Sequence, residues 1–187
     1  MNFPRLTRRQ QKQWEVLQFL IRFLTLAVPL YLILWLNPSL LPVQEAVTDH
    51  SHILLKAMGL EVDKSNLMLM IGTCRPFVIY IGPDCTGWKS MVAYFALIFA
   101  TLGASMRKRV LGLLIGIPLI YAGNLARIVT AIVIEQTLGR EAVMFFHDFM
   151  WQVGLTALII VLWLAWLKWD FIKKHIIALR EKLKYAH

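Results

Sequence analysis

Residues 82–89 read Gly82-Pro83-Asp84-Cys85-Thr86-Gly87-Trp88-Lys89. This stretch joins two different kinds of sequence. Residues 76–81 before it are typical of a short β-strand, whereas residues 90–102 after it form a nearly uninterrupted apolar run that predicts a helix. The junction therefore places Cys85 near a helix N-terminus. Free backbone N–H groups and the helix dipole favour the thiolate form of a cysteine at such a position.

The composition around this stretch is typical of a membrane protein. The chain has 187 residues, of which 58% are hydrophobic and 17% charged, and its mean hydropathy is +0.61. A soluble domain of this size is less apolar. The hydrocarbon core of a bilayer needs about 20 helical residues, and four segments meet that length, at residues 17–36, 87–105, 110–134 and 149–167. The first is predicted to be a retained anchor, because it is too long for a cleaved signal peptide and lacks a small-residue cleavage site.

The basic residues indicate how these segments are oriented. They cluster before the first segment, between the second and third, and after the fourth; the clusters contain Arg5, Arg8, Arg9 and Lys12, then Arg107, Lys108 and Arg109, then Lys168, Lys173, Lys174, Arg180, Lys182 and Lys184. With four spans, all three clusters fall on one side of the plasma membrane, which predicts cytoplasmic N- and C-termini. The net charge of +9 then reflects topology and attraction to anionic lipid, and it does not favour nucleic-acid binding.

An amphipathic helix is predicted on the outer surface over residues 40–60. Its apolar positions, spaced for one helical face, are Val43, Val47, Leu54, Ala57 and Met58. The helix also carries His50 and His52, which point in different directions on a helix. They are interpreted as surface histidines, so no metal site is predicted there.

Residues 67–71 and 77–81 are two apolar runs separated by a turn-rich segment, a pattern that predicts a β-hairpin just ahead of Cys85. The predicted fold is a single all-α integral membrane domain over residues 1–187. It has about four transmembrane helices, the outer-surface amphipathic helix and this short hairpin.

Polar residues inside the third segment point to a site. Asn124 and Arg127 lie one helical turn apart on one face, and Arg127 is about 10–12 Å below the outer end of the helix at about 1.5 Å per residue. An arginine at that depth needs a partner or a wet cavity. His147 and Asp148 begin the fourth segment. Cys85, Arg127 and His147 thus come from three helices and all lie toward the outer leaflet.

Each of these residues also has a structural explanation. Cys85 and Cys74, which are the two cysteines of the chain, could form a disulfide on the oxidising side. Arg127 could cap helix carbonyls or extend to the interface, and His147 could bond the start of its helix. Their convergence at one depth favours the functional interpretation.

The pattern Asp-Cys-Thr-Gly-Trp at one helix start, Gly-Asn-Leu-Ala-Arg inside the next and His-Asp at the head of the following one resembles the exosortase and archaeosortase family of membrane cysteine transpeptidases. The resemblance covers residues 82–166, and the chain is similar to the compact members. It implies that Cys85, Arg127 and His147 are catalytic. It also implies a substrate class: secreted proteins with a C-terminal signal made of a short motif, one transmembrane helix and a basic cluster.

The chemistry expected of these residues needs no cofactor. Cys85 attacks a backbone carbonyl at the extracytoplasmic face, and a thioester forms. His147 takes the proton from the thiol and later gives it to the leaving amine, since an imidazole with a pKa of about 6.5 can both accept and donate a proton near neutral pH. Arg127 stabilises the thiolate or the oxyanion. Supporting roles are expected for Asn124 beside Arg127 and for Asp84 and Asp148 beside His147. The acyl group passes to a lipid or glycan acceptor or to water.

Two other functions remain open on the sequence. A membrane thiol–disulfide oxidoreductase would pass electrons from Cys74 and Cys85 to a quinone, although the chain has no Cys-x-x-Cys pair and this function leaves Arg127 without a task. A non-enzymatic scaffold or small transporter would use Asn124 and Arg127 to line a polar path. A zinc site is disfavoured because Cys85 and His147 supply too few ligands.

Overall fold

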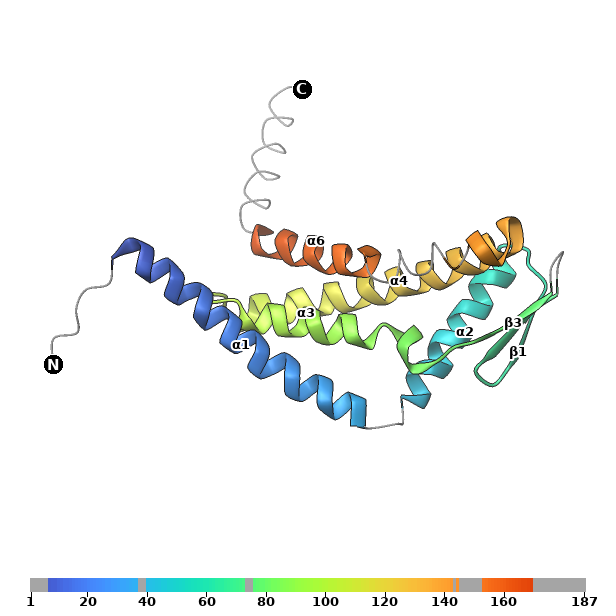
Figure 1. Ribbon diagram of the computed structural model, residues 1–187, viewed down its shortest axis with the longest axis horizontal. Coiled ribbons are helices and arrows are strands. Elements are labelled where there is room, and N and C mark those ends of the chain that lie inside the picture. The colour runs from blue at the N-terminus through green and yellow to red at the C-terminus, as the bar shows by residue number, and fades with distance from the viewer. Residues whose placement is uncertain (1–6, 37–39, 73–75, 143, 145–152, 170–187) are drawn as a thin grey trace, which may run out of the picture.

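The computed structural model describes residues 7–36, 40–72, 76–142, 144 and 153–169. Figure 1 shows helices side by side, with a small sheet and one further helix at one end. The elements in chain order are α1 (Arg8–Leu36), α2 (Leu41–Ala57), β1 (Val62–Ser65), β2 (Met68–Ile71), β3 (Phe77–Tyr80), the 3₁₀ turn η1 (Pro83–Thr86), α3 (Trp88–Ala100), α4 (Met106–Leu138) and α6 (Leu155–Leu167).

Two of these helices, α1 and α4, are long and apolar enough to cross a membrane. They contain the spans predicted at residues 17–36 and 110–134. The described helices α3 and α6 have 13 residues each, which is about 20 Å of helix against a hydrocarbon core of about 30 Å. The predicted span at 87–105 is shorter as a helix because Thr101 is extended and Gly103 is left-handed. Part of the span at 149–167 lies outside the described residues, so four crossings remain a prediction.

Close contacts at glycines hold α3, α4 and α6 together. A Cβ on Gly116 of α4 would overlap the ring of Tyr94 from α3, and a Cβ on Gly112 would lie 2.5 Å from Nε1 of Trp166 in α6. The Tyr94 hydroxyl donates to the Gly112 carbonyl over 3.2 Å, and Trp166 Nε1 donates to the Lys108 carbonyl over 2.9 Å. Small residues of this kind allow helices to approach closely inside a membrane.

The described residues of the three predicted basic clusters lie at one end of this bundle. Lys108 at the start of α4 donates to the Leu167 carbonyl at the end of α6, and α1 runs antiparallel to α3, with Tyr31 against Trp88. The N-terminal end of α1 therefore lies at the same end as the α3–α4 turn, as Figure 1 shows. This arrangement agrees with the sequence-based clustering of the positive charges.

Helix α2 is present as predicted, and the predicted apolar positions are divided between a buried face and an exposed one. Val47 is buried, whereas Val43, Leu54 and Met58 are exposed. The reason is that α2 packs against α4, β1 and η1 through a mixed face of small, polar and apolar side chains. The buried residues of that face are Gln44, Val47, Thr48, Ser51 and Leu55.

The predicted hairpin is confirmed as β2 and β3, which pair antiparallel with Met68 opposite Tyr80 and Ile71 opposite Phe77. A third strand, β1, pairs with the other edge of β2 and was not predicted. Asn66, at φ 52°, lies in the tight turn that joins β1 and β2. Leu69 and Ile71 of the sheet form one core with Ile128 and Ile132 of α4, so the sheet is fixed against the end of α4.

Candidate active site

Cys85 lies in the 3₁₀ turn η1, which a local hydrogen-bond network holds in place. The Cys85 amide donates to the Gly82 carbonyl over 3.0 Å, and the buried Thr86 hydroxyl donates to the Pro83 carbonyl over 2.7 Å. Cys85 is half-buried and carries a free thiol. The sequence predicted it at the N-terminus of the apolar helix; instead, α3 begins three residues later at Trp88, because the left-handed Gly87 (φ 74°) separates the two helical turns.

Asn124 of α4 ties this turn to the bundle. Its side chain is fully buried, and Nδ2 donates to the Cys85 carbonyl over 2.7 Å. Gly87 permits the approach, since a Cβ there would lie 3.0 Å from Cγ of Asn124. The position of the Cys85 backbone is therefore set by an α4 side chain as well as by its own turn.

Arg127 follows one helical turn after Asn124, as the sequence predicted, and its side chain is only 5% exposed. Its Nη2 donates to Oδ1 of Asn124 over 3.1 Å. The guanidinium is also near enough to the Cys85 side chain for a favourable electrostatic interaction between the two groups. The Asn124 side-chain amide thus links the backbone of Cys85 to the guanidinium of Arg127.

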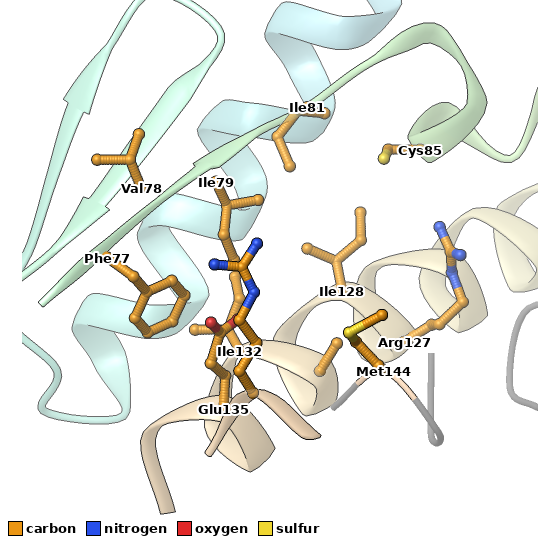
Figure 2. A pocket seen from close by; sticks show the side chains of 12 residues that line it. Phe77, Val78, Ile79, Ile81, Cys85, Arg127, Ile128, Ile132, Glu135 and Met144 are labelled. Carbon is orange, nitrogen blue, oxygen red and sulfur yellow. The ribbon is translucent and has the colours of Figure 1, made fainter. Parts of the chain in front are cut away.

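Cys85 and Arg127 line one cavity of about 700 Å³ between β3 and α4. Figure 2 shows Cys85 and Arg127 toward one end of it, with Phe77 and Ile79 facing α4. Its apolar wall continues along α4, and it also has charged residues away from the thiol; the remaining lining residues are Val78, Ile81, Ile128, Ala131, Ile132, Glu135, Arg140 and Met144. The cavity is large enough for several residues of an extended peptide.

Three residues singled out by the sequence, Cys74, His147 and Asp148, lie outside the described residues. Met144, three positions before His147 in the sequence, is described, and it lines the same cavity as the Cys85 thiol. The structure thus brings Cys85, Asn124 and Arg127 together, and the catalytic roles of Cys85, Arg127 and His147 stay predictions.

Asp84, next to Cys85, is exposed and pairs with Lys89 over 2.7 Å. It lines a separate cavity with residues of α3 and α6, not the cavity of the thiol. Its expected role beside His147 also stays a prediction.

A supporting residue that the sequence analysis missed is Gln44 of α2. It is buried, and its Nε2 donates to the Ile81 carbonyl over 3.0 Å, which fixes the strand that leads to Cys85. The sequence feature that could have pointed to Gln44 is its place as a polar residue within the amphipathic stretch, directly after the apolar position Val43. Only the fold reveals which backbone group such a side chain meets.

The two histidines of α2 have separate partners, as their spacing suggested. His50 Nδ1 lies 2.7 Å from the Tyr121 hydroxyl, and His52 Nε2 lies 3.2 Å from the Val62 carbonyl. Within the described ranges, no group of three or more His, Cys, Asp or Glu side chains is arranged to hold a metal.

A free thiol, a buried cation near it and a cavity that can hold a peptide are features that acyl transfer through a cysteine would use. A family model described as transmembrane exosortase (Exosortase_EpsH) matches residues 6–163. Comparison with curated proteins and with solved structures gave no match.

Proposed function

Because the chain belongs to the transmembrane exosortase family, we propose that it is a membrane cysteine transpeptidase that cleaves the C-terminal sorting signal of secreted proteins and transfers each protein to an acceptor. The observation that carries the proposal is that the free thiol of Cys85 and the buried guanidinium of Arg127 lie at one cavity.

In the proposed reaction, His147 takes the proton of the Cys85 thiol, and the thiolate attacks the carbonyl carbon of the scissile peptide bond. A C–S bond forms, the C–N bond breaks, and the leaving amine takes the proton from His147. An amine or hydroxyl of a lipid or glycan acceptor, or water, then attacks the thioester. The acyl group leaves with the acceptor, and the thiol is regenerated.

Arg127 has two tasks in this scheme. Its positive charge favours the thiolate before attack and then stabilises the oxyanion of the tetrahedral intermediate. A fixed donor in a water-poor site contributes about 3 kcal/mol to such a transition state. Asn124 fixes the guanidinium of Arg127 relative to the Cys85 backbone, because it bonds to both. Asp84 and Asp148 are proposed to orient His147.

The substrate reaches this site from the membrane. The basic ends of α1, α4 and α6 lie at the end of the bundle away from the sheet, which supports cytoplasmic termini and an extracytoplasmic site in the plasma membrane. When the substrate's transmembrane helix binds beside the bundle with its basic cluster in the cytoplasm, the signal motif on the extracytoplasmic side of that helix lies close to Cys85.

The test compares host membranes that carry the wild-type protein, Cys85→Ala or Cys74→Ser. Mass spectrometry of the membrane fraction then looks for secreted proteins that retain their C-terminal helices. We expect retained C-termini with Cys85→Ala and normal processing with Cys74→Ser. Cys74→Ser is the matched control because it removes the other cysteine of the chain.

Equal damage by both substitutions, together with a loss of disulfides in exported proteins, would show a thiol–disulfide oxidoreductase instead. Normal processing by all three proteins would exclude both cysteine-dependent functions and would favour a non-enzymatic role as a scaffold or transporter. The retained C-termini, if found, also identify the recognised signal.

A further inference from the structure

Strand β3 is an edge strand. The sheet order is β1-β2-β3, and in the described part of the chain no strand pairs with the second edge of β3. Free edges are usually protected by lysine, proline, a bulge or a covering element. The sequence of β3, Phe77-Val78-Ile79-Tyr80, contains none of those residues.

The hydrogen-bond register identifies which backbone groups point to the free edge. The Ile81 amide donates to the Leu67 carbonyl over 2.9 Å, so the bonded pairs between β2 and β3 are those of Ile81, Ile79 and Phe77. The backbone N–H and C=O groups of Val78 and Tyr80 alternate with these and therefore face away from β2.

The β1–β2 register provides an independent check. The Gly72 amide donates to the Glu61 carbonyl over 2.9 Å, so the bonded pairs with β1 are those of Met70 and Met68. Residues of β2 thus bond alternately to β1 and β3, as a continuous antiparallel sheet requires. The assignment of Val78 and Tyr80 to the free edge follows from both ladders.

This edge leads to the nucleophile. Residues 77–79 and 81 line the same cavity as Cys85 and Arg127, and Cys85 follows Tyr80 by five residues. Figure 2 shows β3 running toward Cys85, with Phe77 and Ile79 on the side that faces Ile132 of α4. The strand and the reactive thiol therefore belong to one continuous surface.

We propose that an extended segment of the substrate, just before its C-terminal helix, pairs with the free edge of β3 as a fourth strand and is thereby delivered to Cys85. This inference rests on the proposed transpeptidase function and adds the mode of recognition. The backbone groups of Val78 and Tyr80 bind the substrate backbone, as in other cases where a peptide is added to a sheet edge.

The geometry also determines which substrate side chains matter. Neighbouring residues on paired strands share a face of the sheet, so every second substrate residue shares the face of Phe77 and Ile79 and points into the cavity. Ile128 and Ile132 wall this cavity on the α4 side, and Glu135 and Arg140 also line it, so we expect apolar side chains at the substrate positions that lie beside the two isoleucines. The residues between them lie beside the exposed side chains of Val78 and Tyr80.

The test uses full-length protein in proteoliposomes and, as substrate, the precursor protein that accumulates in Cys85→Ala membranes. Val78→Pro removes an N–H at the free edge without removing a bond to β2, whereas Val78→Ala changes the side chain and keeps the N–H. We expect Val78→Pro to lower kcat/KM about tenfold through KM, relative to Val78→Ala. The rate at which a maleimide alkylates Cys85, measured in a Cys74→Ser background, should differ by less than about twofold between Val78→Pro and Val78→Ala, because both variants keep a folded site.

A second measurement stays informative if Val78→Pro fails to accumulate. A photoreactive amino acid at Val78 in the Cys85→Ala protein should crosslink to the precursor, whereas the same group at Met70 should not. Met70 is exposed on the same face and lies opposite Val78 on the central strand, so it is one strand further from the docked segment.

The outcomes separate the two proposals. If no precursor accumulates in Cys85→Ala membranes, the transpeptidase function fails, and this mode of recognition fails with it. If a precursor accumulates but Val78→Pro and Val78→Ala have equal kcat/KM, or positions 78 and 70 crosslink equally, only the strand docking is overturned. A crosslink from position 78 to a second copy of this chain would likewise overturn it and would show self-association at β3.

Discussion

The side-chain amide of Asn124 donates a hydrogen bond to the backbone carbonyl of Cys85 over 2.7 Å. The two residues are 39 positions apart in the sequence and lie on α4 and η1. The same amide accepts a hydrogen bond from Arg127. The alignment of the proposed nucleophile with its cation therefore depends on one buried side chain.

Asn124→Ala should lower kcat about 100-fold, because misplacing a reactive group by about 1 Å costs that much. Asn124→Asp keeps an acceptor for Arg127 but loses the donor to the Cys85 carbonyl. It is expected to be similarly inactive while it keeps Arg127 in place. Turnover of purified precursor measures both variants. Wild-type kcat in Asn124→Asp would show that the tie to Cys85 is dispensable.

Arg127→Lys should lower kcat by about 100-fold or more, since a single ammonium cannot reproduce the planar guanidinium that donates to Asn124 and places its charge at the cavity of Cys85. The matched control is Arg107→Lys, which makes the same substitution in the exposed basic turn at the other end of α4 and should leave kcat unchanged. Full turnover of Arg127→Lys would exclude a direct role for the guanidinium.

Gly87→Ala should be more damaging than Gly103→Ala. Both glycines have φ 74°, so both substitutions carry a backbone strain of about 1–2 kcal/mol. Only Gly87 has a neighbour, since its Cβ would meet Asn124, whereas a Cβ at Gly103 has nothing within 4 Å.

We therefore expect similar losses of thermal stability in detergent for the two variants, and a loss of turnover for Gly87→Ala alone. Equal turnover in both would mean that Asn124 can shift without consequence for the site.

Gly116→Ala should destabilise the helix bundle by about 1–3 kcal/mol, because the new methyl group overlaps the ring of Tyr94. Tyr94→Leu removes that ring, so the double variant should be more stable than the sum of the single effects by about 1 kcal/mol. Unfolding in a detergent titration gives the free energies. The control combination, Gly103→Ala with Tyr94→Leu, should be additive, and additivity in both combinations would contradict the packing described for Gly116.

Features that depend on local pattern were predicted well from the sequence. The apolar length of α1 and α4, the hairpin of β2 and β3, and the one-turn spacing of Asn124 and Arg127 are all properties of short sequence windows. The proximity of Cys85 to Arg127 also followed, because both were placed toward one end of adjacent antiparallel helices.

Features that depend on tertiary contacts were not predicted. The apolar run after Trp88 does not show that the helix ends at Ala100, where the Thr101 hydroxyl turns back to the Leu97 carbonyl. Strand β1 is short and polar, with the sequence Val-Asp-Lys-Ser, and pairs only because β2 offers an edge. The partner of Asn124 is a backbone carbonyl far away in sequence, which no residue pattern encodes.

Helix α4 is bonded both to α3, by Tyr94 to the Gly112 carbonyl, and to the turn η1 that precedes α3, by Asn124 to the Cys85 carbonyl. A movement of the Cys85 backbone away from Asn124 must break the second of these bonds, and a movement of the guanidinium away from Asn124 must break the hydrogen bond of Arg127, so the fold positions the cysteine backbone and the arginine together. Little reorganisation energy then remains for the moment when charge develops on the substrate oxygen. Preorganised sites of this kind stabilise a transition state more than water does, because their dipoles already point in the required direction.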